Sequence, residues 1–529
     1  MSSMPHLSRI NGKTMLMVDD QPYIMLAGEA HNSSSSSLPY MEAVWEKAEV
    51  LGMNTVLLPV TWEMIEPEEG YFDFSLVKGL IDQARQRSMR IGILWFGAWK
   101  NAQCYYAPSW VKTDPIRFPR AEIIKGKHFI LLEDFYQMPY STLSYLGEET
   151  CLADARAFAK LMAFLREYDG KCHTVLTVQV ENETGIMGAA REHSDAADAL
   201  FDAPVPSEFA AYMHEHTASM APDVRQVVLE GKEAGSWSEI FGSVAEEIFS
   251  AYYVSRYVGQ VARAGKTEYG LPMTVNCWLN KTGESAGMYP SGGPVSRMTE
   301  VWRFCAPEID IISPDIYVPH FADVCAEYTR RENPLYIPEC ATHSYAASRA
   351  LFSIGKYHAI CYAPFGFEDI GLPMNGAQMA LFGADATDPA LVTPQEAERY
   401  GRMNHLLSGM MGKLTNAYGS ENLKAAICEE EQQATLKFGN FGIRVSFSAP
   451  DGACLALEDE EFIYILAQSS AISFVSISKD LPGIDILLLE EGSFCQNVWR
   501  AERRLNGDEA VVCACDGPTL YRTKLYVYC

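Results

Sequence analysis

The sequence lacks the features that mark secreted, membrane-spanning and cysteine-ligated metal proteins. Residues 1–6 show no basic segment followed by an apolar one, so no secretory signal is visible. No apolar run approaches the roughly 20 residues that a membrane-spanning helix needs. The 14 cysteines are scattered without a C-x-x-C spacing, and Cys513 and Cys515, the closest pair, are weak evidence for a metal. We therefore expect a cytoplasmic protein with reduced thiols.

Several motifs of cofactor and nucleophile chemistry are also absent. The chain has neither a Gly-rich phosphate-binding loop nor a G-x-S-x-G nucleophile elbow. His31, His320 and His343 stand near the ends of predicted strands, but their spacing matches no zinc pattern, so we interpret them as loop residues. We expect neither a metal nor a cofactor.

Positive charge is scarce, because 42 Lys and Arg residues face 68 Asp and Glu residues and leave a net charge of −26. This excess argues against nucleic acid or an anionic membrane as a partner. It suits a soluble protein that acts on a neutral ligand, although solubility alone would also account for it. With 529 residues, 48% of them hydrophobic, the chain can bury large cores in more than one domain.

Apolar segments with strand propensity alternate with segments of helical period through the first 415 residues. The segments expected to be strands are 23–29, 54–60, 90–96, 174–180, 272–276, 309–312, 334–338 and 359–365. Eight strands that alternate with helices predict an α/β fold, a (β/α)8 or TIM barrel. We expect this barrel, with a short N-terminal hairpin, to occupy residues 1–415.

Two segments interrupt the expected alternation of strands and helices. Residues 185–243 form an insertion that is too long for a plain loop and is a candidate cover for the site. Residues 33–37 are all serine, which predicts a flexible loop near the mouth of the barrel.

After residue 415 the pattern changes to short alternating strands such as 442–447, 461–466 and 471–477, separated by turn residues. This pattern predicts a smaller all-β, sandwich-like C-terminal domain over residues 416–529.

Two of the predicted barrel strands run into a glutamate. The fourth ends in Q-V-E-N-E at 179–183, and the seventh in P-L-Y-I-P-E at 334–339. Hydrolysis of a glycosidic bond with retention needs two carboxyl groups about 5–5.5 Å apart, one as acid/base and one as nucleophile. A parallel barrel brings the ends of distant strands together at one rim. The sequence therefore indicates a carbohydrate-hydrolysing pair.

The surroundings of these glutamates fit that chemistry. Asn182 can donate to a sugar 2-hydroxyl, and the hydroxyl of Tyr317, at the end of the preceding strand, can orient Glu339. Glu181 competes with Glu183, because alternate residues share one face of an ideal strand and periodicity does not separate them.

At these residues the chain resembles the clan-A retaining glycoside hydrolases, which carry the Q-V-E-N-E motif. The segments T-W-E at 61–63 and E-P-E-E-G-Y-F-D-F-S at 66–75 resemble an element of the family 35 and family 42 β-galactosidases. Residues 94–101, 276–279 and 289–294 resemble a bacterial branch of family 35 that carries a C-terminal β-domain of unknown function.

The resemblance implies that Glu183 is the acid/base, Glu339 the nucleophile, Asn182 the residue that holds the 2-hydroxyl, and Tyr317 a neighbour of the nucleophile. Further candidate substrate-binding residues are Trp62, Glu63, Trp95, Asn276 and Trp278. The implied activity is that of an exo-acting retaining β-galactosidase, which removes terminal β-D-galactose from small oligosaccharides or glycoconjugates without a cofactor. Family analogy also implies a homodimer.

One departure leaves the sugar open. Residues 96–99, F-G-A-W, stand where family 35 enzymes of the animal and fungal type carry a proline-tyrosine-isoleucine-cysteine stretch. The alternatives are a β-glucosidase, a β-fucosidase or an α-L-arabinopyranosidase. A non-hydrolytic carbohydrate-binding protein is less favoured, because both catalytic carboxylates are present.

Overall fold

The computed structural model describes residues 3–132, 137–318, 320–342, 345–373, 395–477, 483–511 and 513–528. The chain divides into two compact units. One consists of Met1–His6, Asn32–Met41 and Leu57–Val318, and the other of Leu7–His31, Glu42–Val56 and Pro319–Cys529. This division runs through the barrel strands and does not test the predicted domain limits of 1–415 and 416–529, which stay a prediction.

The main sheet is a parallel barrel. Over the described residues its strand order is β12-β14-β4-β5-β6-β9-β10-β11-β13. The strands are β4 (Met25–Glu29), β5 (Thr55–Thr61), β6 (Arg90–Phe96), β9 (Val175–Val180), β10 (Met273–Trp278), β11 (Ile311–Ile316), β12 (Tyr336–Ile337), β13 (Glu339–Cys340) and β14 (Cys361–Tyr362). The pairs β6–β9, β9–β10, β10–β11, β12–β14 and β14–β4 are parallel.

The first and last strands of this order belong to one chain segment. Pro338 separates β12 from β13, because proline has no N–H to donate to a strand ladder. The sheet order therefore closes on itself with eight chain segments, each within a few residues of its predicted position. The predicted (β/α)8 barrel is confirmed.

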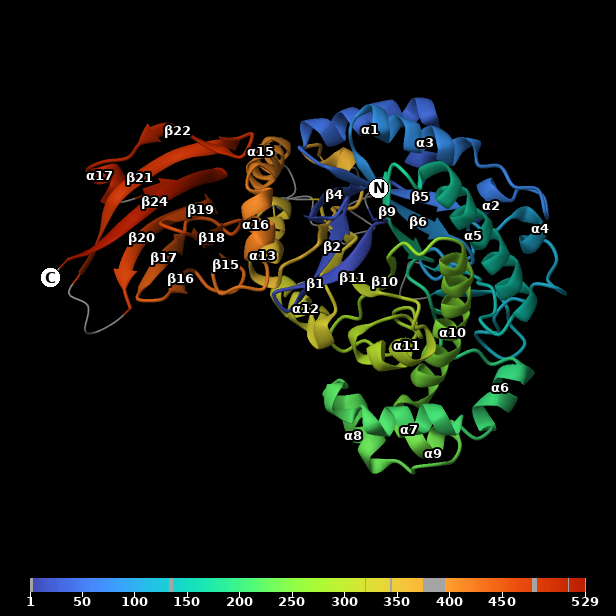
Figure 1. Ribbon diagram of the computed structural model, residues 1–529. Helices are drawn as coiled ribbons and strands as arrows, with labels where there is room; N and C mark the ends of the chain where they lie inside the picture. Colours follow the sequence, from blue (N-terminus) through green and yellow to red (C-terminus); the bar gives the residue numbers. More distant parts are fainter. Residues whose placement is uncertain are drawn as a thin grey trace. The chain divides into compact units, whose positions relative to one another are not determined.

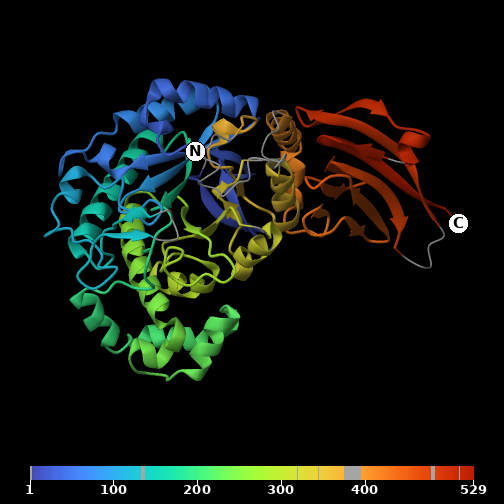
Figure 2. The same cartoon turned by 180° about the vertical axis from the view of Figure 1, so that it is seen from behind.

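Helices follow the strands as the helical periodicity predicts. They are α1 (Leu38–Val50), α2 (Trp62–Ile65), α3 (Ser75–Gln86), α4 (Ser109–Lys112), α5 (Glu148–Asp169), α10 (Ala245–Glu268), α11 (Thr299–Cys305), α12 (Phe321–Tyr328) and α13 (Ala346–Tyr357). In α3, Val77, Leu80, Ile81 and Ala84 form the buried stripe that their spacing predicts. The long helices α5 and α10 lie side by side (Figures 1 and 2).

A small antiparallel sheet stands at the N-terminus, formed by β1 (His6–Ile10), β2 (Lys13–Val18) and β3 (Gln21–Tyr23). The predicted hairpin is its β2–β3 pair, and the turn residues Asp19 and Asp20 both have positive φ, as tight hairpin turns require. A second short pair, β7 (Ile130–Leu132) and β8 (Met138–Tyr140), lies between β6 and α5 in the sequence.

The segment predicted as an insertion is helical. It contains α6 (Asp195–Asp202), α7 (Ser207–Glu215), α8 (Pro222–Glu230) and α9 (Trp237–Phe241), and Figures 1 and 2 show α7, α8 and α9 grouped beyond one end of α10. Trp237 of α9 packs on Phe209 of α7 and on Tyr252 of α10. Arg191 binds Asp198 at 2.8 Å, so two polar groups of this segment stabilise each other.

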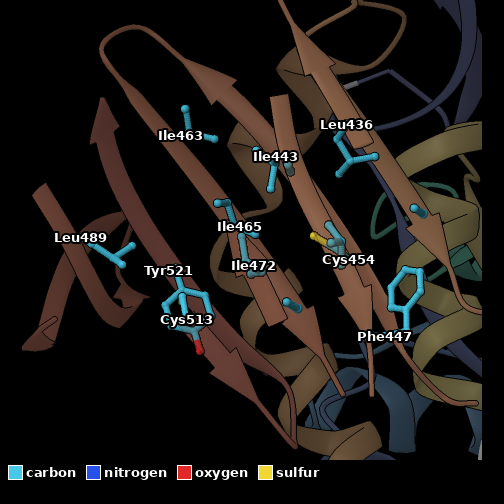
Figure 3. Close-up of a cluster of buried hydrophobic side chains, with 14 of the residues drawn as sticks. Leu436, Ile443, Phe447, Cys454, Ile463, Ile465, Ile472, Leu489, Cys513 and Tyr521 are labelled. Atoms are coloured by element: carbon cyan, nitrogen blue, oxygen red, sulfur yellow. The ribbon is translucent and has the colours of Figure 1, made fainter. Parts of the chain in front are cut away.

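The C-terminal region is all-β, as predicted. One sheet has the order β15-β18-β19-β24-β21-β22 and the other β16-β17-β20-β23 over the described residues. The strands are β15 (Leu423–Ile427), β16 (Gln433–Phe438), β17 (Phe441–Phe447), β18 (Ala453–Asp459), β19 (Phe462–Gln468), β20 (Ser470–Ser476), β21 (Gly483–Cys495), β22 (Val498–Arg504), β23 (Cys513–Cys515) and β24 (Thr519–Tyr528). Side chains from both sheets, including Ile443, Ile465 and Ile472, form one buried cluster (Figure 3).

Helices join the C-terminal strands to the chain that precedes them. They are α15 (Gln395–Gly409) and α16 (Met411–Ala417), and a further short helix, α17 (Asp508–Val511), precedes β23. The barrel helix α13 packs on β15 and β18. A Cβ atom at Gly355 of α13 would lie 2.6 Å from Cβ of Ala425, so this close approach requires glycine.

Candidate active site

The chain changes direction sharply where β9 ends. The strand stops at Val180, and Glu181 and Glu183 have φ angles of +63° and +45°, in the left-handed region that side chains with a Cβ rarely occupy. The expectation that these two glutamates share one face of an extended strand is therefore wrong, because neither residue is extended. Such backbone strain persists only where surrounding contacts hold it in place, and it is common at functional sites.

Glu181 forms a buried carboxyl pair with Asp154 of α5. Glu181 Oε2 accepts the backbone N–H of Trp99 at 2.8 Å. Asp154 accepts the indole N–H of Trp95 at 2.9 Å and the hydroxyl of Tyr257 at 3.0 Å. Burial raises the pKa of Glu181 well above its usual value, and the neighbouring Asp154 raises it further. Burial also raises the pKa of Asp154. Burial and the neighbouring carboxyl therefore both favour the protonated form of Glu181.

Gly97 makes room for this carboxyl pair. A Cβ atom at position 97 would lie 2.5 Å from Glu181 Oε1, 2.5 Å from Trp95 Nε1 and 2.7 Å from Asp154 Oδ1. Any other residue would displace the pair. The F-G-A-W stretch noted in the sequence thus contains a glycine with a specific packing role.

Glu183 belongs to a second polar cluster, on the ends of β10 and β11. Its backbone N–H donates to Asn276 Oδ1 at 3.0 Å, and Asn276 Nδ2 donates to Asp315 Oδ2 at 2.8 Å. A carboxylate oxygen of Glu183 lies within 4.8 Å of one of Asp315. Both side chains are almost fully buried, at 4% and 2% exposure. Asn276, predicted as a substrate contact, therefore fixes the backbone of Glu183 and orients Asp315.

Three other predicted residues, Asn182, Trp278 and Tyr317, lie at or just after the ends of β9, β10 and β11. The backbone N–H of the fully buried Asn182 donates to the carbonyl of Trp99 at 3.3 Å. The partly buried Tyr317 directly follows β11, and its backbone N–H donates to the carbonyl of Asp315 at 3.2 Å. Trp278 is also partly buried and stands opposite Asp315 in the β10–β11 register.

Trp62 and Trp95 do not line an open surface, in contrast to their predicted role as substrate contacts. Both are 0% exposed. The indole N–H of Trp62 donates to Glu66 at 2.9 Å, as that of Trp95 does to Asp154. Because a buried indole N–H normally has such a partner, we interpret both tryptophans as packing residues. Glu63 is 38% exposed and forms an ion pair with Lys112 at 3.2 Å.

Glu339 begins β13, directly after Pro338, and is 4% exposed. The histidines near strand ends differ from one another. His31 Nε2 lies 2.8 Å from Asp369 Oδ2, a contact that raises the pKa of His31, whereas His320 is exposed. His343 lies outside the described residues.

The sequence did not single out Asp154, Tyr257 or Asp315. Asp315 had a usable signal, because it is a charged residue inside the otherwise apolar strand β11. Asp154 had none, because its partners Trp95 and Tyr257 are 59 and 103 positions away in the chain.

Comparisons with known proteins give a family model and a curated relative. A family model described as a domain of unknown function, DUF5597, matches residues 400–513. A curated relative, a β-galactosidase of Xanthomonas manihotis, is 37% identical over 62 residues, which are 12% of this chain and 10% of that protein. The resemblance to β-galactosidases with a C-terminal domain of unknown function is thereby confirmed.

Three solved structures match parts of the chain at low TM-scores. The β-galactosidase from Bacillus circulans sp. alkalophilus has a TM-score of 0.43 at 12% identity, over 73% of this chain and 56% of that one. The β-amylase catalytic domain from Paenibacillus polymyxa has a TM-score of 0.44 at 11% identity, over 67% and 96%. The β-galactosidase from Rahnella sp. R3 has a TM-score of 0.44 at 13% identity, over 75% and 57%.

These structural likenesses are too distant to define an activity. The chain spans a tenth of the curated relative and little more than half of the two β-galactosidase structures. Among the described residues, no helix is both long and apolar enough to cross a membrane.

Proposed function

We propose that the protein is an exo-acting retaining β-galactosidase that removes terminal β-D-galactose from small oligosaccharides or glycoconjugates. One observation carries the proposal: Glu183 follows the fourth strand of a closed parallel barrel, and Glu339 begins β13, the second half of the interrupted seventh strand. Catalytic groups of such barrels stand at the carboxyl ends of the strands. The short segment similar to a β-galactosidase supports the choice of sugar.

In this proposal the reaction is a double displacement. The carboxylate of Glu339 attacks the anomeric carbon, and the bond to the leaving-group oxygen breaks as protonated Glu183 donates its proton to that oxygen. Glu183 then takes a proton from water, whose oxygen attacks the anomeric carbon and releases Glu339.

The surroundings of Glu183 suit the role of acid and base. Two carboxyl groups as close as Glu183 and Asp315 are costly to ionise together, so the cluster favours a proton on one of them. The hydrogen bonds of Asn276 fix the positions of both residues before substrate arrives.

A panel of nitrophenyl glycosides tests the activity and the sugar preference. We expect the highest kcat/KM on the β-D-galactoside. A higher value on the glucoside, fucoside or α-L-arabinopyranoside would replace the galactosidase by that activity. Binding of galactosides without turnover of any glycoside would replace it by a carbohydrate-binding protein.

Covalent labelling tests the assigned roles. A 2-deoxy-2-fluoro-galactoside should label Glu339, as peptide mass spectrometry would show, and a label on another residue would overturn the assignment. With azide as an external nucleophile, Glu183→Ala should give the β-galactosyl azide and Glu339→Gly the α-galactosyl azide. Exchanged product configurations would exchange the two roles.

The homodimer is a second proposal and rests on analogy alone. Light scattering coupled to size-exclusion chromatography distinguishes a monomer of 58.9 kDa from a dimer.

A further inference from the structure

A cavity of about 240 Å³ lies where β5 ends, beside α2 and the first turns of α3. One wall is the serine run, which was predicted as a flexible loop. It instead forms a 3-10 helix, η1 (Ser34–Ser36), and the buried Ser35 hydroxyl donates to the carbonyl of Pro59 at 2.6 Å. The cavity therefore has an ordered wall formed by the loop after the first barrel strand.

The lining combines polar groups with an apolar floor. Thr61 is 7% exposed, and its buried Oγ1 has no hydrogen-bond partner among the described residues. The buried Oδ1 of Asn32, which also lines the cavity, likewise has no hydrogen-bond partner among the described residues. The floor consists of buried Ile65 and Leu80. A buried polar atom without a partner is costly, so its presence in a cavity wall points to a ligand that completes the hydrogen bond.

The carboxylates around the cavity disfavour an anionic ligand. Glu63 and Asp73 both line it, and Tyr106 forms part of the wall. The pKa of Tyr106 is raised by burial, against the opposing effect of Lys100 and the Ser33 hydroxyl, so this phenol keeps its proton and can donate. Carboxylates that accept and hydroxyls that donate or accept fit an uncharged polyol, and the apolar floor fits the C–H face of a sugar ring.

The size and position of the cavity limit how large its ligand can be and which part of a substrate could reach it. At about 30 Å³ per water molecule, the volume corresponds to roughly eight waters, which suits one sugar ring better than a chain of them. In the sheet order β5 stands two strands from β9, which Glu183 follows. At about 4.8 Å per strand this separation is roughly 10 Å, the reach of the next sugar along a substrate.

We propose that this cavity binds the leaving-group sugar of the substrate, an uncharged pyranose that Thr61, Asn32 and Glu63 recognise through its hydroxyls. The assignment rests on the proposed hydrolase function and adds to it a preference for disaccharide-like substrates over aryl glycosides.

Thr61→Val tests the assignment, because it removes the hydroxyl and nearly preserves the shape. We expect KM for a galactosyl disaccharide to rise about 2–10-fold, as for one lost hydrogen bond, while kcat/KM for nitrophenyl galactoside stays unchanged. The matched control is Thr274→Val on β10, whose buried Oγ1 also lacks a partner among the described residues but which does not line the cavity. Thr274→Val should affect both substrates equally.

Two results would overturn the proposal. One is an equal effect of Thr61→Val on disaccharide and aryl substrate, and the other is an unchanged KM for the disaccharide. If the protein hydrolyses no glycoside, saturation-transfer NMR with free glucose and free galactose tests the cavity independently. Transfer to a monosaccharide that Thr61→Val weakens and Thr274→Val does not would support the binding site while the hydrolase function fails. Absence of transfer to both sugars would reject the site as well.

Discussion

The two glutamates on either side of Asn182 each belong to a carboxyl pair, Glu181 with Asp154 and Glu183 with Asp315. The surroundings of the two pairs differ. Glu181 and Asp154 are fully buried, and indole, phenol and backbone donors bind them. Glu183 and Asp315 are almost as buried, but an asparagine amide links them through the backbone of one and the carboxylate of the other. Burial alone therefore does not distinguish a structural acid from a candidate catalytic one.

The two glutamates also differ in the contacts that hold them among the described residues. For Glu181 the carboxylate itself accepts the N–H of Trp99, so this side chain contributes to the structure of the fold. For Glu183 the contacts with Asn276 and Ala102 engage the backbone N–H and C=O. A backbone held in a left-handed conformation then positions the side chain without using its oxygens in those contacts.

The largest expected difference between Glu183 and Glu181 appears when each glutamate is converted to its amide. Glu183→Gln should lower kcat for a galactosyl disaccharide by about 10²–10⁴-fold, because general acid–base catalysis contributes that much. Glu181→Gln should lower it less than about tenfold, since the amide replaces the protonated partner of a pair that shares a proton. Initial rates of sugar release measure both. Similar losses in the two variants would remove the functional distinction.

The next largest effect concerns stability. Asp154→Ala leaves the indole N–H of Trp95 and the hydroxyl of Tyr257 without their acceptor. Each buried donor left in this state costs about 1–3 kcal/mol, so the free energy of unfolding should fall by about 2–6 kcal/mol for the two donors. Urea unfolding measures the change, and Asp154→Asn, which keeps one oxygen acceptor, is the control and should lose less. A change below about 1 kcal/mol in Asp154→Ala would show that these bonds do not stabilise the pair.

The contrast between the two glutamates also shows which parts of the fold and the site could be predicted from the sequence. Strand and helix periodicity located the barrel strands, because each apolar run buries on both faces of a parallel sheet. It did not distinguish Glu181 from Glu183, because periodicity assumes an extended strand and both residues have positive φ. The resemblance to glycoside hydrolases, rather than periodicity, assigned Trp62 and Trp95 to the substrate. Their indole partners, Glu66 and Asp154, explain why both are packing residues instead.

Long-range pairing accounts for most of what was missed. Asp154 lies on a helix, and nothing in its neighbourhood in the sequence indicates that it meets Glu181. Pro338 is the opposite case, because a proline that interrupts a strand is visible in the sequence, and it explains the division into β12 and β13. Local chemistry was therefore predictable where the backbone is regular, and tertiary contacts were not.

A smaller effect tests how tightly the Glu181–Asp154 pair is packed. Gly97→Ala places a methyl group within 2.7 Å of both carboxyl groups, and such overpacking costs about 1–3 kcal/mol of stability. Gly412→Ala is the control, since it lies on α16 with no atom within 4 Å of its Cβ, and it should gain about 0.5–1 kcal/mol. Thermal unfolding of both variants measures the difference. If Gly97→Ala were as stable as the wild type, the pair could shift, and its geometry would not constrain the turn.

The most specific effect is a pH dependence of stability. The raised pKa values of Glu181 and Asp154 favour a proton on the folded pair that the unfolded chain releases above about pH 4, the ordinary range of Asp and Glu. The folded state then binds one proton more than the unfolded state, so this pair lowers the free energy of unfolding as pH rises, by at most about 1.4 kcal/mol per pH unit until the folded pair ionises. Groups such as Asp198, whose pKa of about 2 is held low first by Lys125 and then by Arg191, act in the opposite direction and lose their contribution as pH falls. Groups such as Asp198 contribute equally to the wild type and to Glu181→Gln. The difference in the free energy of unfolding between the two proteins therefore contains only the contribution of the carboxyl pair. We expect that difference to fall from pH 5 to pH 8, and a flat difference would show that the pair does not share a proton.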